Sequence, residues 1–363
     1  MAGGGGEPGA ARGGGTPGAG DARGVRAPLA TKARRRGMGL AAAGWVAAAP
    51  FLALACAWAL GRMAGDRTWP WQALYWIPAL AAVIACATAW TVLRLTGRGA
   101  RGARAGRVVA VLLGAWAAVV VALQDVGWGG WGAARRAELT LTHWNARWPG
   151  RQALECGRAL APALGDVTVI SNPGAIVNRV VSDEWLPADV RGGDVVVRDL
   201  GPVAVVARIT VLEFRLLEYL DVPDVGIVWA ALLVVAPGAG SDDVRILVID
   251  LPSDPKEPRG RVADALEAML ARHPEAADPD LVVGDTNCTP GSVVFERCFA
   301  RLGRCEPWRA SGWLPTYPRE RPFWRIDAML ANHARLHWAR YRTIDLGVGA
   351  HKAQQGAFER TRP

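Results

Sequence analysis

The sequence predicts an α+β sandwich domain preceded by three transmembrane helices. Three long runs near the start of the chain contain no charged residue, which is typical of segments that cross a bilayer. The rest of the chain alternates strand-like runs rich in Val and Ile with a few helical stretches. Hairpin-like strands mixed with few helices favour an α+β sandwich over a simple doubly wound sheet.

The first segment, Met1–Gly37, is dominated by Gly, Ala, Pro and Arg. It has too few large apolar side chains to offset the entropy of ordering, so we expect a disordered tail over residues 1–37. The membrane anchor is expected over residues 38–126. Its three spans are predicted at Leu40–Leu60, Trp69–Leu93 and Val108–Leu123.

Two features qualify these spans. Pro50 and Pro78 are expected to kink the first two helices, which membrane helices tolerate when neighbours satisfy the freed backbone groups. The alternative interpretation of these apolar runs is that they are buried helices of a soluble protein. A cleaved signal peptide fits the sequence less well, because the first apolar run starts late and two more follow.

Arginines predict the orientation. Three of them, Arg34–Arg36, precede the first span, and the connection between the second and third spans carries five more: Arg94, Arg98, Arg101, Arg104 and Arg107. Because positive residues favour the cytoplasmic side, the tail and this connection are predicted to be cytoplasmic. We therefore expect a multi-pass protein of the cell membrane whose chain after about Gly127 is extracytoplasmic. The net charge of +9 is partly this topology signal and does not argue for nucleic-acid binding.

Four of the six cysteines lie after the predicted spans, in a compartment that permits disulfides. Their spacing lacks the paired Cys-x-x-Cys elements of a structural zinc site. A disulfide between Cys298 and Cys305 and free buried thiols both remain open.

The extracytoplasmic domain is expected over residues 137–359. Its predicted strands are 138–146, 166–173, 193–199, 202–217, 226–237, 244–252, 281–285, 325–332 and 337–347, and its predicted helices are 157–165 and 259–273. Polar residues follow many of these strands: Asn145, Asn172, Asp250, Asp285 with Asn287, Asp327 and finally His351. Each one alone is compatible with a turn, a surface position or a local ion pair. Together they are the pattern expected if the strand ends converge on one site.

Several of these segments resemble the endonuclease/exonuclease/phosphatase superfamily of metal-dependent phosphoesterases. An early strand ends in Asn145, the Gly-Asp-x-Asn motif is matched by Gly284–Asn287, and a late Ile-Asp strand contains Asp327. His351 then corresponds to the histidine of a Ser-Asp-His motif. The resemblance covers roughly Glu138–Phe358 and implies a DNase-I-like four-layer α/β sandwich, in which two packed mixed β-sheets are flanked by helices. Spans in front of such a domain resemble a bacterial arrangement with the phosphoesterase outside the membrane.

The resemblance implies roles for the site residues. Asp285 would orient or deprotonate the attacking water, with Asn287 supporting it and the phosphate. His351, paired with Asp327, would hold the phosphoryl oxygens. Asn145, Asn172 and Asp250 would be the candidate ligands of a divalent metal, Mg²⁺ or Mn²⁺. The substrate would be a phosphodiester or phosphomonoester, and no specific protein partner is implied besides the lipid bilayer.

Three positions depart from the family pattern. Asn172 stands where a metal-binding glutamate is usual, Ala350 where an aspartate precedes the final histidine, and Asp250 where Asn-Thr-His is frequent. Losing two carboxylates should weaken the binding of a hard cation such as Mg²⁺. The sequence therefore leaves two hypotheses, a phosphoesterase with an altered metal site and a pseudoenzyme that binds phosphate ligands or acts as a scaffold. A transporter is disfavoured because the spans carry no ionisable residue.

Overall fold

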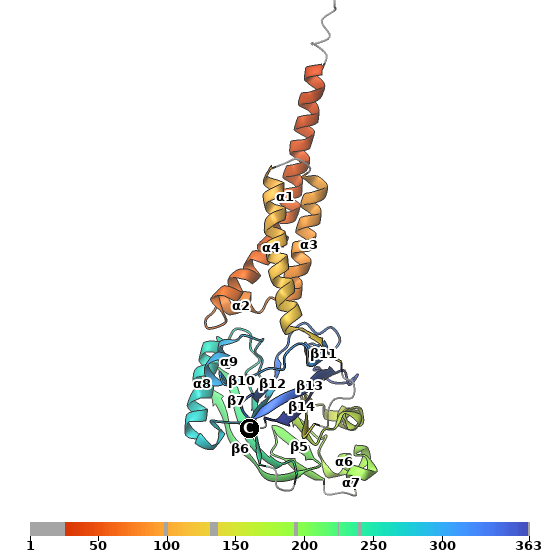
Figure 1. Ribbon diagram of the computed structural model, residues 1–363, viewed down its shortest axis with the longest axis vertical. Helices are drawn as coiled ribbons and strands as arrows, with labels where there is room; N and C mark the ends of the chain where they lie inside the picture. The colour runs from red at the N-terminus through yellow and green to blue at the C-terminus, as the bar shows by residue number, and fades with distance from the viewer. Residues whose placement is uncertain are drawn as a thin grey trace, which may run out of the picture.

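The computed structural model describes residues 26–97, 101–130, 137–191, 195–223, 225–238 and 242–361. Long helices form a rod at one end of the molecule, and a β-rich domain forms the other end (Figure 1). Four helices make up the rod and its base: α1 Arg26–Ala64, α2 Trp71–Tyr75, α3 Ala79–Thr96 and α4 Arg101–Gln124.

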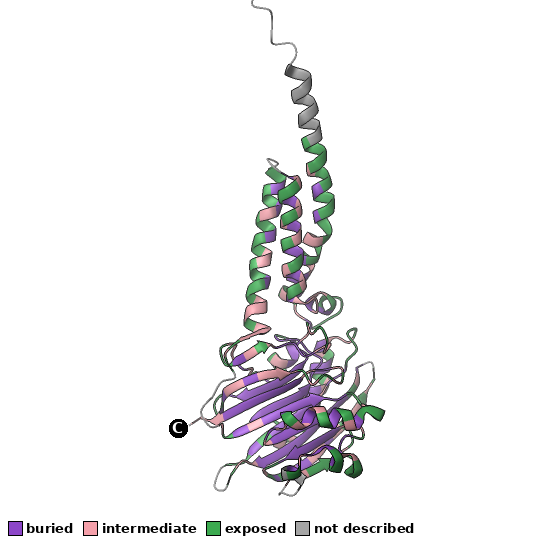
Figure 2. Ribbon diagram, turned by 90° about the vertical axis from the view of Figure 1, so that its right-hand side faces the viewer, coloured by how far each residue is buried: buried purple, intermediate pink, exposed green. Residues whose placement is uncertain are grey.

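Three segments in this part are long and apolar enough to cross a membrane, namely Gly37–Ala64, Ala79–Thr96 and Arg101–Gln124. Their outward surfaces are largely exposed (Figure 2), as lipid-facing surfaces would be. Small side chains let the helices approach closely, because Ala48 on α1, Ala89 on α3 and Ala110 on α4 pack in one cluster.

The second predicted span and the predicted tail both need correction. Trp69–Leu93 is not one helix, because α2 ends at Tyr75 and α3 starts at Ala79, where Pro78 is the extended N-cap residue. Residues 1–25 of the expected disordered tail lie outside the described residues. Residues 26–37 belong to α1, where Ala and Arg are good helix formers.

The domain contains two mixed β-sheets. The first has the strand order β1-β11-β13-β14-β2-β3-β5-β4. Its strands are β1 Val126–Trp128, β2 Leu139–Asn145, β3 Val167–Ser171, β4 Val196–Asp199, β5 Val203–Ala207, β11 Ala310–Trp313, β13 Leu336–Ile344 and β14 Ala353–Arg360. The strand β1 directly follows α4, so the end of the anchor is hydrogen-bonded into this sheet through β11.

The second sheet has the order β10-β12-β9-β8-β7-β6. Its strands are β6 Thr210–Val222, β7 Gly226–Ala236, β8 Val244–Asp250, β9 Leu281–Asp285, β10 Leu302–Gly303 and β12 Asp327–Asn332. The predicted strand 202–217 is thus two strands in different sheets, β5 and β6, separated by Arg208 and Ile209.

Helices cover the outer face of each sheet, which gives four layers. A large apolar cluster fills the space between the sheets, with Leu141 and Val169 from one sheet and Val248 and Val283 from the other. A second cluster packs α8 (Arg259–Arg272) and α9 (Val293–Cys298) on one outer face. A third packs α5 (Ala153–Leu160) and α6 (Arg179–Trp185), which precedes the short helix α7 (Ala188–Arg191), on the other. This is the four-layer sandwich predicted from the sequence.

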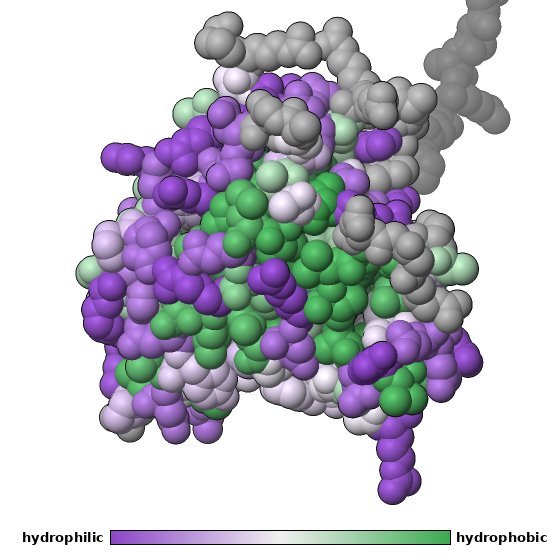
Figure 3. All heavy atoms as spheres, turned by 90° about the horizontal axis from the view of Figure 1, so that it is seen from below, coloured by the Kyte–Doolittle hydropathy of each residue, from purple (hydrophilic) through white to green (hydrophobic). Residues whose placement is uncertain are grey.

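The face of the domain opposite the long helices has an apolar centre ringed by hydrophilic residues (Figure 3). Leu212 on β6 and Val197 on β4 are among the exposed apolar residues of these strands. All six cysteines are free thiols, so the Cys298–Cys305 disulfide left open by the sequence does not form.

Candidate functional site

Three aspartates lie side by side at one end of the second sheet. Asp285 on β9 pairs with Asp250 on β8 and with Asp327 on β12. Residues paired across neighbouring strands point to the same face of a sheet. Since Val283 and Val248, two positions earlier, belong to the cluster between the sheets, the three carboxylates also project toward the facing sheet.

Asn145, on the first sheet, contacts one of these carboxylates. It ends β2, and its Nδ2 donates to Oδ2 of Asp285 at 2.6 Å. Its Oδ1 accepts hydrogen bonds from the backbone N of Arg147 at 3.0 Å and from Nδ2 of Asn172 at 3.2 Å. Asn145 therefore closes a turn and also contacts Asp285, so its place in a turn does not exclude a role at the site.

Asn172 and Asn287 complete the polar network. Nδ2 of Asn172 donates to Oδ2 of Asp250 at 2.9 Å. The backbone N of Asn287 donates to Oδ1 of Asp285 at 3.0 Å, and Nδ2 of Asn287 donates to the carbonyl of Leu251 at 2.8 Å. The Gly-Asp-x-Asn segment is thus both a turn and the centre of a buried hydrogen-bond network.

His351 stands between two carboxylates. Its Nδ1 lies 2.9 Å from Oδ2 of Asp327, and its Nε2 lies 3.8 Å from Oδ2 of Asp285. The imidazole is buried, and the ring of Tyr317 packs on it with centroids 4.8 Å apart. Asp327 pairs with this histidine and not with Arg325, which instead donates to the carbonyl of Gln124 at the end of α4.

Burial and mutual charge shift the pKa values of these groups. Burial, reinforced by Asp327, raises the pKa of Asp285 to about 7. Burial and the neighbouring Asp285 raise the pKa of Asp250 well above its usual value. Burial opposes charge on His351 too, but Asp327 and Asp285 outweigh it and raise the pKa of His351 to about 9. Asp327 keeps a lowered pKa despite its burial, because it faces the imidazolium.

The donor set is suited to a hard divalent cation. Ligand atoms of Asp285, Asp327 and His351 lie within 4.8 Å of one another. Oδ1 of Asp327 is buried without a hydrogen-bond partner among the described residues, which leaves a carboxylate oxygen available to a ligand. Carboxylate oxygens are the groups that Mg²⁺ and Mn²⁺ prefer, so the residues present fit such an ion.

Backbone strain is concentrated at this site. Arg147, Trp148, Asn172 and Asn287 are the non-glycine residues with positive φ in the described chain, with values of 53°, 55°, 52° and 46°. Asn172 and Asn287 belong to the site, and Arg147 and Trp148 lie two and three positions after Asn145. Such conformations are costly for residues with a Cβ and persist where the surroundings impose them, typically at functional sites.

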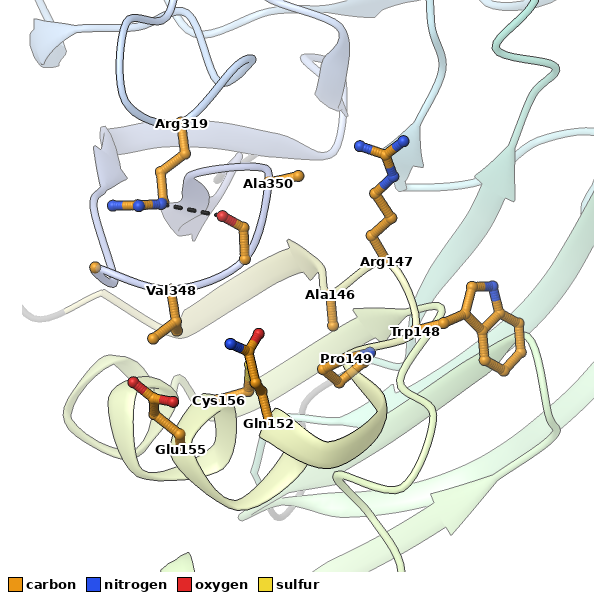
Figure 4. A pocket seen from close by; sticks show the side chains of 12 residues that line it. Ala146, Arg147, Trp148, Pro149, Gln152, Glu155, Cys156, Arg319, Val348 and Ala350 are labelled. Atoms are coloured by element: carbon orange, nitrogen blue, oxygen red, sulfur yellow. Dashed lines mark hydrogen bonds between the residues drawn. The ribbon is translucent and has the colours of Figure 1, made fainter.

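A cavity of about 430 Å³ opens beside the polar network (Figure 4). Its lining includes Ala146 and Arg147, next to Asn145, and Ala350, next to His351. The Arg319 side chain is held at its rim by a hydrogen bond to the Gly349 carbonyl, drawn dashed in the figure. The guanidinium of Arg147 is exposed and electrostatically opposes protonation of His351. The cavity thus lies next to the segments that carry Asn145 and His351, and its lining includes the cationic Arg147 and Arg319 together with the acidic Glu155.

The structure brings together all seven residues singled out from the sequence: Asn145, Asn172, Asp250, Asp285, Asn287, Asp327 and His351. Sequence reasoning missed Tyr317, whose ring covers His351, and His143, which lies behind the site. His143 is bonded to Ser171 and Gln354, and burial lowers its pKa to about 4. No turn or motif signal marks these two residues, because their partners come from distant strands.

No family model and no curated protein matches the chain. Among solved structures, it is similar to a mannosyl-6-phosphatase from Bacteroides thetaiotaomicron VPI-5482, at 15% identity and a TM-score of 0.47 over 61% of this chain and 99% of that one. It is also similar to the catalytic domain of human nocturnin with bound sulfate, at 13% identity and a TM-score of 0.47 over 63% and 97% of the two chains. An endonuclease/exonuclease/phosphatase family protein from Bacteroides thetaiotaomicron gives 14% identity and a TM-score of 0.46 over 61% and 97%. At these identities the likeness concerns the fold.

Proposed function

We propose that this chain is a membrane-anchored, extracytoplasmic phosphoesterase that hydrolyses a phosphodiester or phosphomonoester with the help of Mg²⁺ or Mn²⁺. The observation that carries the proposal is the buried cluster of Asp285, Asp327 and His351, tied to Asn145 from the facing sheet. Orientation and charge stabilisation account for most of the catalysis of phosphoryl transfer, and this cluster provides both.

The residues take the following roles. Asp285, held by Asn145 and by the backbone N of Asn287, has a pKa of about 7 and is poised to accept a proton from water near neutral pH. His351, protonated through Asp327, presents Nε2 to a phosphoryl oxygen and offsets the negative charge of the transition state. Exposed Arg147 lies at the cavity, where it can bind the phosphate.

Asp327 and Asp250 are the carboxylates that would hold the divalent ion beside Asp285. A bound Mg²⁺ or Mn²⁺ supplies Lewis-acid polarisation of a phosphoryl oxygen. Asp250 compensates in part for the carboxylate that is missing at position 172, because its own carboxylate lies within hydrogen-bond distance of Asn172. The altered site therefore retains anionic ligands although Asn172 and Ala350 contribute none.

One observation favours a second candidate, a pseudoenzyme that binds phosphate ligands. The side-chain amide of Asn172 donates a hydrogen bond to Oδ2 of Asp250, and the residue before His351 is Ala350 instead of an aspartate. If these two features abolish ion binding, the remaining Arg147, Asn287 and His351 still form a binding site for an anion.

Calorimetric titration of Mg²⁺ and Mn²⁺ into the full chain in detergent separates the two candidates. Asp327→Asn removes the charge of the carboxylate whose Oδ1 lacks a partner, with little change in shape. Asp254→Asn, in the exposed turn after β8, is the matched control. We expect wild type and the control to bind the ion, and Asp327→Asn to bind it at least about tenfold more weakly. Absence of binding at millimolar ion in wild type would favour the pseudoenzyme.

A further inference from the structure

The catalytic loops are attached directly to the ends of the membrane helices. Near the end of the first span, Nη1 of Arg62 lies 3.5 Å from the carbonyl of Pro290, which also accepts a hydrogen bond from the hydroxyl of Tyr75 at 2.8 Å. At the end of the third span, the carbonyl of Gln124 accepts a hydrogen bond from Nη1 of Arg325 at 2.8 Å. These contacts involve the loop that carries Asn287 and the segment directly before β12, which begins at Asp327.

A third connection reaches His351 through aromatic rings. Nε1 of Trp324 donates to the carbonyl of Trp76, directly before the second span, at 3.0 Å. The ring of Trp324 stacks on Tyr317, and Tyr317 packs on His351, with centroid separations of 6.2 Å and 4.8 Å. Every predicted span therefore has an end in contact with a loop of the site.

Chain geometry limits how far the site can lie from the membrane surface. Two residues lie between Asn287 and Pro290, so their Cα atoms are at most about 11 Å apart. One residue lies between Arg325 and Asp327, which gives at most about 7 Å. The headgroup layer of one leaflet is itself about 5–8 Å thick. A phosphate in that layer is therefore close to the site without leaving the membrane surface.

Exposed aromatic side chains lie on the same elements. Trp69 and Trp71, in the loop and short helix after the first span, are 54% and 41% exposed. Phe323, adjacent to Trp324, is 36% exposed. Aromatic rings of this kind favour the interface between headgroups and acyl chains, so they would hold the site against the leaflet.

We infer that the substrate is a phosphoester lipid of the leaflet in which the anchor ends, bound with its headgroup at the carboxylate cluster. This inference rests on the proposed function and narrows its substrate to lipids. Water cleaves a P–O ester bond of the headgroup: its oxygen is added to phosphorus, the alkoxide leaves, and the proton accepted by Asp285 returns to the leaving oxygen. No oxidant or reductant is required.

Full-length protein in phosphatidylcholine nanodiscs tests the inference. The probes are phosphatidylglycerol and phosphatidic acid in the disc, compared with glycerophosphoglycerol and glycerol 3-phosphate in solution, all with Mg²⁺ or Mn²⁺. Each pair has the same phosphoester, and only the lipid is confined to the membrane. We expect the lipid to be hydrolysed at least about tenfold faster at equal total concentration, because confinement raises its effective concentration.

Equal or faster hydrolysis of the water-soluble members would overturn the lipid inference while the proposed function stands. Hydrolysis of neither member, together with no turnover of bis(p-nitrophenyl) phosphate, would overturn both. Trp71→Ala and Phe323→Ala should reduce turnover of the lipids alone. Tyr219→Ala, which removes an aromatic ring of similar exposure on β6, is the matched control and should change neither rate. Equal losses on lipid and soluble probes in the first two variants would also contradict the inference.

Discussion

The carboxylate of Asp66 accepts a hydrogen bond from the backbone N of Val293 at 2.9 Å. Asp66 follows the first span, and Val293 begins α9 directly after the Gly-Asp-x-Asn loop. Asp66 is fully buried, and burial raises its pKa. The loop between the first two spans is therefore part of the packed domain, and it holds the segment that carries Asp285 and Asn287.

Replacing Asp66 should destabilise this segment. In Asp66→Ala the backbone N of Val293 is left buried without a partner, so we expect the free energy of unfolding to fall by about 1–3 kcal/mol. Arg67→Ala breaks only the exposed pair with Glu296 and should change it by less than about 1 kcal/mol. Chemical denaturation of the two variants in detergent measures the difference. Equal stability of both would show that the Asp66 contact contributes little.

Asp285→Asn should abolish most turnover while the fold is retained. The amide is nearly isosteric, and its Oδ1 can still accept the hydrogen bond from the backbone N of Asn287, although its Nδ2 replaces the oxygen that accepts from Asn145. It cannot take a proton from water. We expect kcat to fall by about 10²–10⁴-fold on a substrate that the wild type cleaves. The exposed Asp254→Asn variant is the control. Wild-type kcat in Asp285→Asn would remove Asp285 from the proposed role.

Metal-free protein should lose stability as pH rises from about 6 to 9. The pKa of His351 is raised to about 9 from 6.5, so its stabilising charge is present in full below 6.5 and is lost as pH passes through 9. The pKa of Asp285 is raised to about 7 from 3.8, so the cost of ionising it in the folded state develops between these values and is complete above 7. Both groups lower the stability as pH rises, Asp285 up to about pH 7 and His351 from about pH 6.5 to 9.

Thermal unfolding in a chelator at several pH values measures this loss. In His351→Gln the part of the loss between pH 6.5 and 9 should disappear, while the part below 7 due to Asp285 should persist. A wild-type melting temperature that rises between pH 7 and 9 would contradict the assignment of His351.

The sequence predicts the fold class and identifies the polar residues that the structure brings together, but it misses part of the first sheet. Polar residues at strand ends were readable because apolar runs such as that of β9 end abruptly at Asp285. The strand β14 could not be predicted from the sequence, because its Ala-Gln-Gln-Gly segment lacks the apolar residues that mark a strand. In the structure the side chain of Gln354 is buried and forms hydrogen bonds with His143 and with the hydroxyl of Tyr341. Both partners lie on other strands.

The same reason explains the missed role of the anchor. Asp66 is only a charge between two spans in the sequence, and its partner Val293 is 227 residues away. Tyr317 likewise becomes relevant only because a loop brings it to His351. Contacts of this kind depend on how the layers pack, which local patterns do not encode.

An excised domain, residues 137–361, should therefore have a loosened catalytic loop. It lacks the hydrogen bonds from Asp66, Gln72 and Tyr75, and β1, which pairs with β11. We expect faster amide hydrogen exchange at Cys288–Val294 than in the full chain, because local opening is easier where buried contacts are missing. The amides of Trp229–Val235 in β7, which is paired on both sides by β6 and β8, are the internal control and should exchange equally in both. Equal exchange at Cys288–Val294 would show that the domain holds its own site, whereas the expected increase would mean that ion binding and turnover have to be measured on the chain with its anchor.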